Sequence, residues 1–196
     1  MNILSTNKKK LILASKSPRR MELMQQAGLQ FTTHLAGETD EIYPSHLQRE
    51  EIPLFLSQIK ADAYLSVVEI TDDTVVITAD TIVWINNKTL EKPADRNEAI
   101  EMLETLSGNM HQVFTGVCLS STKKRSCFFD ESKVFFEKLS HEEIVYYVDN
   151  FHPYDKAGAY GIQEWIGCVG IERIEGTFHN IVGLPVQKLY RELKKF

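Results

Sequence analysis

The chain of 196 residues lacks the features of several protein classes. Its three cysteines are odd in number and have no C-x-x-C spacing, which argues against a disulfide framework and a zinc site and favours reduced thiols. No apolar run is long enough for a signal peptide or a membrane-spanning helix, so we expect a cytoplasmic protein without membrane contact. Basic residues do not predominate: 22 Lys and Arg against 27 Asp and Glu leave a net charge of −5. Non-specific nucleic-acid binding depends on a basic surface, so nucleic acid is not expected as a partner.

The apolar residues that are present, 43% of the chain, suffice for a proper core. Strand and helix signals alternate along the whole length, which favours an α/β class, or α+β, with a mixed sheet. We expect strands at residues 11–14, 74–85, 111–121, 126–139 and 167–176, and helices at 18–27, 52–68, 96–107, 141–149 and after Pro185.

One short stretch, "LILASKSPRRMELM" at residues 11–24, combines a buried strand with a helix start. Ser17 is expected to cap the helix and Pro18 to occupy its first position. Arg19 and Arg20 then lie in the first turn, where each cation is unfavourable by about 0.3–1 kcal/mol because the helix end is already positive. The pattern indicates either an anion bound at this turn or an ordinary capped helix with solvated arginines.

Asp80 interrupts the apolar run from Val75 to Ile85. A buried carboxylate is costly unless it is paired, metal-bound or functional. If Asn86-Asn87 forms a two-residue hairpin turn, Thr81 lies opposite Lys92, and Lys92 lies diagonally beside Asp80. The alternative is a hairpin end with an incidental ion pair.

Three segments are informative together: "LILASKSPRRMELM", "ITADTIVWINNKTLEKPADRNEAIEMLETLSGNMHQVFTGVCL" and "DKAGAYGIQEWIG" with the later "GTFHNIVGLPVQKLY". In this order and along nearly the whole chain, they resemble the Maf family of nucleoside triphosphate pyrophosphatases. The resemblance implies one domain over residues 1–196 with two lobes around a cleft, a mixed α/β fold similar to inosine triphosphate pyrophosphatases. It also implies a divalent-metal-dependent reaction in which a nucleoside triphosphate and water give the monophosphate and pyrophosphate, with Asp80 as the base.

The resemblance further implies the site. Ser15, Ser17, Arg19 and Arg20 would cradle the phosphates with the helix N-terminus, while Lys60 and Lys92 match basic positions and Glu41 matches an acidic position near the metal. Oxygen ligands suit Mg²⁺, with Mn²⁺ as the alternative. The alternative for Lys60 is a solvated charge on a helix.

Three residues resemble the subgroup of the family that prefers dTTP and UTP: Arg19, Thr81 and Gln163. The glutamine amide offers a donor and an acceptor to uracil or thymine, although it could flip to serve other bases. Glu164 and Trp165 replace the smaller residues common after this glutamine. The size of the base pocket, and therefore whether it accepts modified pyrimidines, stays open. Three alternatives stay open: a broad-specificity pyrophosphatase, a phosphatase, and a septum-formation-inhibitor-type interaction protein. The chain lacks the P-loop pattern that would favour another phosphate enzyme. A homodimer is possible.

Overall fold

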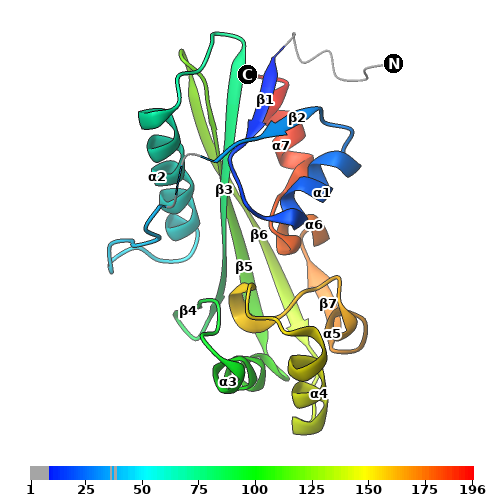
Figure 1. Cartoon of the computed structure of the whole chain (residues 1–196). Coiled ribbons are helices and arrows are strands. Elements are labelled where there is room, and N and C mark those ends of the chain that lie inside the picture. Colours follow the sequence, from blue (N-terminus) through cyan, green and yellow to red (C-terminus); the bar gives the residue numbers. More distant parts are fainter. Residues whose placement is uncertain (1–8, 36, 38) are drawn as a thin grey trace. The chain divides into compact units, whose positions relative to one another are not determined.

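The structure is a computed structural model that describes residues 9–35, 37 and 39–196 (Figure 1). Residues 1–8, on which part of the expectation about signal peptides depends, lie outside this range, as do residues 36 and 38. The chain divides into two compact units. Unit 1 takes its residues from 1–80, 115–130 and 183–196, and unit 2 from 81–114 and 131–182. The cleft expected between two lobes stays a prediction.

The elements alternate much as the sequence patterns predict. In chain order, they are β1 (Lys10–Leu13), α1 (Pro18–Gln26), β2 (Phe31–Thr33), α2 (Glu51–Val67), β3 (Thr74–Ile85), β4 (Lys88–Leu90), α3 (Arg96–Leu106), β5 (Met110–Ser120), β6 (Arg125–Phe136), α4 (His141–Phe151), the 3₁₀ turn η1 (Ala157–Ala159), α5 (Trp165–Val169), β7 (Ile171–Glu175), α6 (Phe178–Val182) and α7 (Val186–Leu193).

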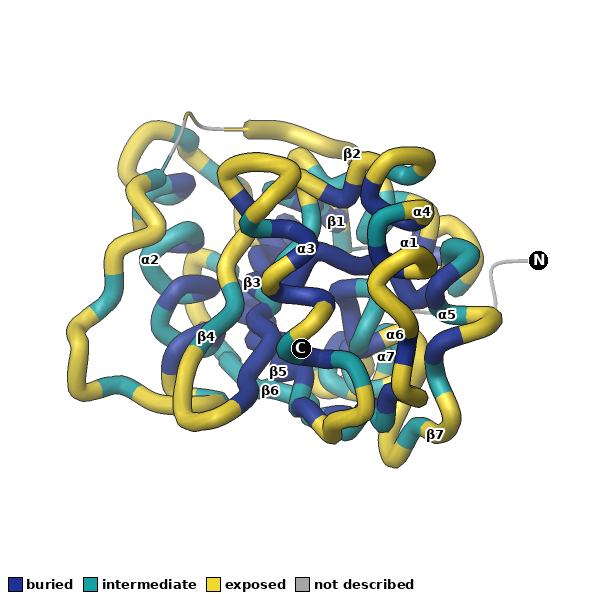
Figure 2. The backbone as a smooth tube through the Cα atoms, turned by 90° about the horizontal axis from the view of Figure 1, so that it is seen from below, coloured by how far each residue is buried: buried dark blue, intermediate teal, exposed yellow. Residues whose placement is uncertain are grey.

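The strands form one mixed sheet in the order β2-β1-β3-β5-β6-β7, with β4 paired to β3. In unit 1, β1 runs parallel to both β2 and β3, and in unit 2 the β3–β4 and β6–β7 pairs are antiparallel. Eleven of the twelve residues of β3 are buried, as expected for a central strand, and its run appears in dark blue in Figure 2. The expectation of a mixed α/β fold with a central sheet and flanking helices is confirmed.

The predicted hairpin turn is also confirmed. Asn86 and Asn87 have φ values of 51° and 58°, the left-handed pair that a two-residue turn between twisted strands requires. The predicted register holds from Ile85 opposite Lys88 to Val83 opposite Leu90. Because β4 ends at Leu90, the ladder does not extend to Lys92, and the place of Lys92 beside Asp80 stays a prediction.

One expected strand was partly wrong. The segment 167–176 was predicted to be extended throughout, but its first three residues complete the short helix α5, and β7 begins only at Ile171. A short apolar run does not distinguish a buried helix turn from a strand. A Cβ atom at Gly167 would lie 1.8 Å from the carbonyl oxygen of Ile162, so this turn requires a glycine.

The core of unit 2 contains a buried histidine, His111, which is 1% exposed. Its Nε2 atom lies 2.7 Å from the hydroxyl of Tyr160, and its ring packs against those of Phe136 and Tyr160. Burial lowers the pKa of His111 to about 3, because the charged imidazolium is poorly solvated there.

This burial predicts an acid-dependent stability. The unfolded chain binds a proton at His111 below about pH 6.5, whereas the folded chain resists protonation down to about pH 3. Stability from neutral His111 is therefore present above pH 6.5 and falls by roughly 1.4 kcal/mol per pH unit below it. We expect His111→Gln to remove this part of the slope in urea unfolding between pH 7 and pH 4, and His179→Gln, at an exposed site, to retain it. Equal slopes in wild type and His111→Gln would contradict the prediction.

The described residues include no helix with both the length and the apolar character needed to cross a membrane.

Candidate active site

Asp80 is the buried carboxylate of unit 1, on β3, with 6% of its surface exposed. Burial raises the pKa of Asp80 above its ordinary value, and the positive charges of Lys60 and Arg20 oppose this rise. Asp80 is thus a carboxylate with increased basicity that lies beside two cations. That combination suits a group that accepts a proton during a reaction.

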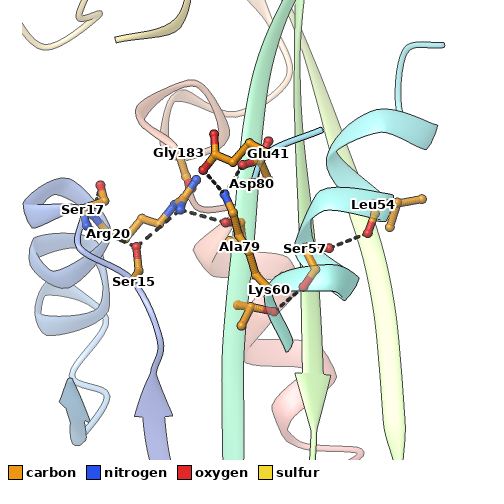
Figure 3. Close-up of polar contacts among 11 residues, drawn as sticks. Ser15, Ser17, Arg20, Glu41, Leu54, Ser57, Lys60, Ala79, Asp80 and Gly183 are labelled. Carbon is orange, nitrogen blue, oxygen red and sulfur yellow. Dashed lines mark hydrogen bonds and ion pairs between the residues drawn. The ribbon is translucent and has the colours of Figure 1, made fainter. Parts of the chain in front are cut away.

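Lys60, on α2, connects two carboxylates. Its Nζ atom lies 2.5 Å from Oδ1 of Asp80 and 2.7 Å from Oε1 of Glu41 (Figure 3). The Lys60 side chain is only 18% exposed, whereas that of Glu41 is 48% exposed. Lys60 is therefore an internal charge at a carboxylate pair, and the alternative of a solvated helix lysine is wrong.

Hydroxyl groups hold α2 against β3 at this point, and sequence analysis missed them. The hydroxyl of Thr78, two residues before Asp80, donates a 2.7 Å hydrogen bond to the carbonyl oxygen of Ser57, one turn before Lys60. Ser57 in turn donates to the carbonyl oxygen of Leu54 at 2.8 Å. Both hydroxyl side chains are fully buried, so the bonds fix how the helix and the strand present Lys60 and Asp80 to each other. In the sequence, these bonds are indicated only by a polar residue within each apolar pattern, Thr78 in the strand and Ser57 in the helix.

Arg20, in the first turn of α1, points towards the same strand. Its Nε atom donates to the carbonyl oxygen of Gly183 at 2.8 Å, and its Nη1 atom donates to that of Ala79 at 2.9 Å and to Oγ of Ser15 at 3.4 Å. Burial lowers the pKa of Arg20, and the negative charge of Asp80 partly compensates. The cation at this helix start is therefore stabilised in part by the protein's own acceptors, which the sequence pattern did not reveal.

The two serines organise the start of α1. Ser17 caps the helix as predicted, since its Oγ atom accepts from the backbone N–H of Arg20 at 3.4 Å. Ser15 is buried, and its Oγ atom accepts from the backbone N–H of Ser17 at 3.2 Å. Arg19 is partly exposed beside them. The first turn of α1 has no acidic residue. Arg20 brings this turn close to Asp80, because its side chain donates to the carbonyl oxygen of Ala79, the preceding residue.

The remaining predicted site residues belong to unit 2. Thr81 follows Asp80 in β3 and is half-buried, Lys92 is exposed just beyond β4, and Gln163 is exposed in the turn before α5. The structure thus brings together Ser15, Ser17, Arg20, Glu41, Lys60 and Asp80 within unit 1. A common site that also includes Thr81, Lys92 and Gln163 stays a prediction.

Comparison with protein families identifies the chain. The model of the family described as "Maf-like protein" matches residues 10–196. The chain belongs to the Maf family. Among its curated relatives, the dTTP/UTP pyrophosphatase of Bacteroides thetaiotaomicron is 53% identical over 96% of this chain and 97% of its own length. Proteins of the same name from Parabacteroides distasonis and Porphyromonas gingivalis are each 51% identical over 96% of this chain and over 97% and 95% of their own lengths.

A solved structure resembles this Maf protein in fold. The HAM1 protein from Coxiella burnetii superposes with a TM-score of 0.53 over 96% of this chain and 100% of its own chain. The two share only 14% sequence identity, so the likeness concerns the fold alone. It supports the expected architecture and adds nothing about substrate.

The carboxylates of this Maf protein offer oxygen donors of the kind that a divalent ion prefers. Within the described ranges, no group of three or more His, Cys, Asp or Glu side chains could hold a metal by itself. Two carboxylates, Glu41 and Asp80, reach the same ammonium group, which shows that their oxygens converge on one cationic position. Mg²⁺ binds through one or two carboxylates, together with waters and substrate phosphates, and this donor set matches it.

Proposed function

We propose that the chain hydrolyses dTTP and UTP to the monophosphate and pyrophosphate. The single observation that carries the proposal is buried Asp80, of raised pKa, in contact with Lys60 and close to the helix start that bears Arg20. The names of relatives that are about 50% identical along nearly the whole chain support the substrate. Lys60 and Arg20 attract a polyanion, and Asp80 supplies the base that hydrolysis needs.

In the proposed reaction, Asp80 takes a proton from a water molecule as the water oxygen attacks the α-phosphorus atom. The bond from that phosphorus to the oxygen bridging the α- and β-phosphates breaks, and pyrophosphate leaves with the bonding electrons. Ser15, Ser17 and Arg20 hold the phosphates at the start of α1, where the unpaired N–H groups and the helix dipole favour anions. Arg19, beside them, binds phosphate or the base-proximal part of the nucleotide. Lys60 keeps Asp80 ionised and oriented before proton transfer.

We further propose a divalent cation, Mg²⁺ or Mn²⁺, held by Glu41, Asp80 and phosphate oxygens. When bound, it supplies positive charge that neutralises the phosphates. With the ion bound, the long flexible side chain of Lys60 would allow its ammonium group to face the substrate phosphates as well as Asp80. A cytoplasmic location is consistent with a nucleotide substrate, and a homodimer stays a prediction.

Base recognition is assigned to Arg19, Thr81 and Gln163, and a substrate panel tests it. We expect dTTP and UTP to exceed CTP, ATP and GTP in kcat/KM by about tenfold or more, because the wrong base edge leaves polar groups of the site unpaired. Product identification separates the reaction classes: pyrophosphate supports the proposal, and orthophosphate indicates a phosphatase. Comparable rates for ATP, GTP and UTP would instead indicate a broad-specificity pyrophosphatase.

The matching variant is Gln163→Ala. We expect it to reduce the preference for dTTP and UTP more than it lowers the best rate, because the amide reads the base and does not take part in bond breaking. The check is kcat/KM for UTP and CTP in both proteins. An unchanged UTP-to-CTP ratio would remove Gln163 from base recognition.

A further inference from the structure

Gln163 is the third residue of a tight turn whose ends are tied together. The backbone N–H of Glu164 donates to the carbonyl oxygen of Gly161 at 3.0 Å, which closes the turn around Ile162 and Gln163. Ile162 is buried and Gln163 is exposed, so the turn anchors on one residue and presents the next. The direction of the glutamine amide therefore depends on how firmly Gly161 and Glu164 are held.

One hydroxyl group holds both ends of this turn. Tyr147, on α4, is fully buried, and its oxygen accepts a 2.9 Å hydrogen bond from the backbone N–H of Gly161. The same hydroxyl donates to Oε2 of Glu164. Burial and the neighbouring carboxylate raise the pKa of Tyr147, so the hydroxyl keeps the proton that it donates.

Lys156 secures the carboxylate from its other side. Its Nζ atom lies 3.1 Å from Oε1 of Glu164 and 2.7 Å from Oδ1 of Asp155, and its side chain is only 10% exposed. Glu164 thus has one oxygen on Tyr147 and the other on Lys156. The sequence left open whether Glu164 changes the size of the base pocket; in the structure, its carboxylate serves these internal contacts.

Gly161 has no Cβ atom, and this leaves room for the carboxylate of Glu164. A Cβ atom at this position would lie 2.7 Å from Cδ of Glu164, within the space that the carboxylate occupies. A methyl group there would displace the flexible end of Glu164, whose carboxylate bonds to Tyr147. Gly161→Ala therefore perturbs the same link by a route independent of Tyr147.

We propose that Tyr147, Glu164 and Lys156 are positioning residues for base recognition, because they lock the turn that presents Gln163. The inference rests on the proposed function, in which Gln163 reads the base. It assigns the discrimination between uracil or thymine and other bases to a rigid turn as well as to the amide itself. A preorganised amide loses less conformational freedom on binding and tolerates a mismatched edge less well.

The test compares Tyr147→Phe and Gly161→Ala with Tyr146→Phe, the same loss of a hydroxyl one residue earlier, where the side chain is 49% exposed. We expect the UTP-to-CTP ratio of kcat/KM to fall about fivefold to tenfold in the first two variants, through a higher KM for UTP at nearly unchanged kcat. Tyr146→Phe should keep the wild-type ratio. Glu164→Gln, whose amide oxygen can still accept from Tyr147, should lose less discrimination than Glu164→Ala.

A double variant shows whether the tyrosine acts through Gln163. Added to Gln163→Ala, Tyr147→Phe should cause no further fall in the ratio, because the side chain that it positions is gone. An equal fall in both backgrounds, or a uniform loss of kcat for all nucleotides, would overturn the proposal in favour of a purely structural role. If Gln163→Ala lowers the ratio and Tyr147→Phe and Gly161→Ala do not, the positioning role alone fails. If Gln163→Ala itself leaves the ratio intact, base reading by Gln163 fails, and the positioning role fails with it.

Discussion

The Asp80→Asn variant is expected to lose at least about a hundredfold in kcat while it binds nucleotide with comparable affinity, because general-base contributions amount to roughly 10²–10⁴. The amide has nearly the shape of the carboxylate but cannot take the proton from water. Asp80 is buried, and burial raises its pKa, so the loss concerns a side chain already suited to accept that proton. Steady-state kinetics with UTP give kcat, and titration with nucleotide gives the dissociation constant.

Asp62→Asn is the matched control for this change. Asp62 lies on α2 with Lys60, but its carboxylate is 60% exposed and pairs with Arg125 at 2.6 Å. We expect its turnover to match wild type. Near-normal turnover of folded Asp80→Asn would exclude Asp80 as the base. The Asp80→Asn variant also tests the alternative that the chain is an interaction protein. An effect on septation that is independent of catalysis should survive the loss of activity in this variant.

The Arg20→Ala variant is expected to weaken nucleotide binding by about tenfold or more and to lower the free energy of unfolding by about 1–3 kcal/mol. Binding should weaken because the proposed phosphate site loses a positive charge. Stability falls because the carbonyl oxygens of Ala79 and Gly183 lose the donors that Arg20 supplies at 2.9 and 2.8 Å. Dissociation constants measured in the Asp80→Asn background avoid turnover, and urea unfolding gives the stability.

Arg19→Ala separates the two effects. Arg19 shares the first turn of α1 with Arg20 and is partly exposed, so we expect weaker nucleotide binding with a much smaller loss of stability. Arg20→Lys should retain part of the binding but not the full stability, because an ammonium group lacks the fork that reaches both carbonyls. Wild-type dissociation constants for both alanine variants would exclude a phosphate cradle at this helix start.

Local chemistry explains what the sequence predicted well. Ser17 caps α1, and Asn86-Asn87 forms the turn between β3 and β4, because capping and left-handed turn conformations depend on residues within a few positions. Asp80 stood out as a buried carboxylate because it interrupts an apolar strand, and the structure places it in the core of unit 1.

The pattern of the segment 167–176 did not separate helix from strand. Its apolar residues suit either state, and in the structure a Cβ atom at Gly167 would lie 1.8 Å from the carbonyl oxygen of Ile162. Such a contact is a property of packed backbone. The helix and strand propensities of the residues therefore do not predict such a contact.

The sequence by itself therefore determined most of the longer elements, the cap of α1 and the turn between β3 and β4, the membership in the Maf family, and the residues worth testing. Only the tertiary structure decided that Lys60 bridges Glu41 and Asp80, that Arg20 turns inward to two carbonyl oxygens, and that Tyr147 ties both ends of the turn before α5. These contacts join positions from 14 to 163 residues apart. Side-chain direction across such separations depends on how helices pack on strands, and each charge then takes the partner that burial has brought within reach.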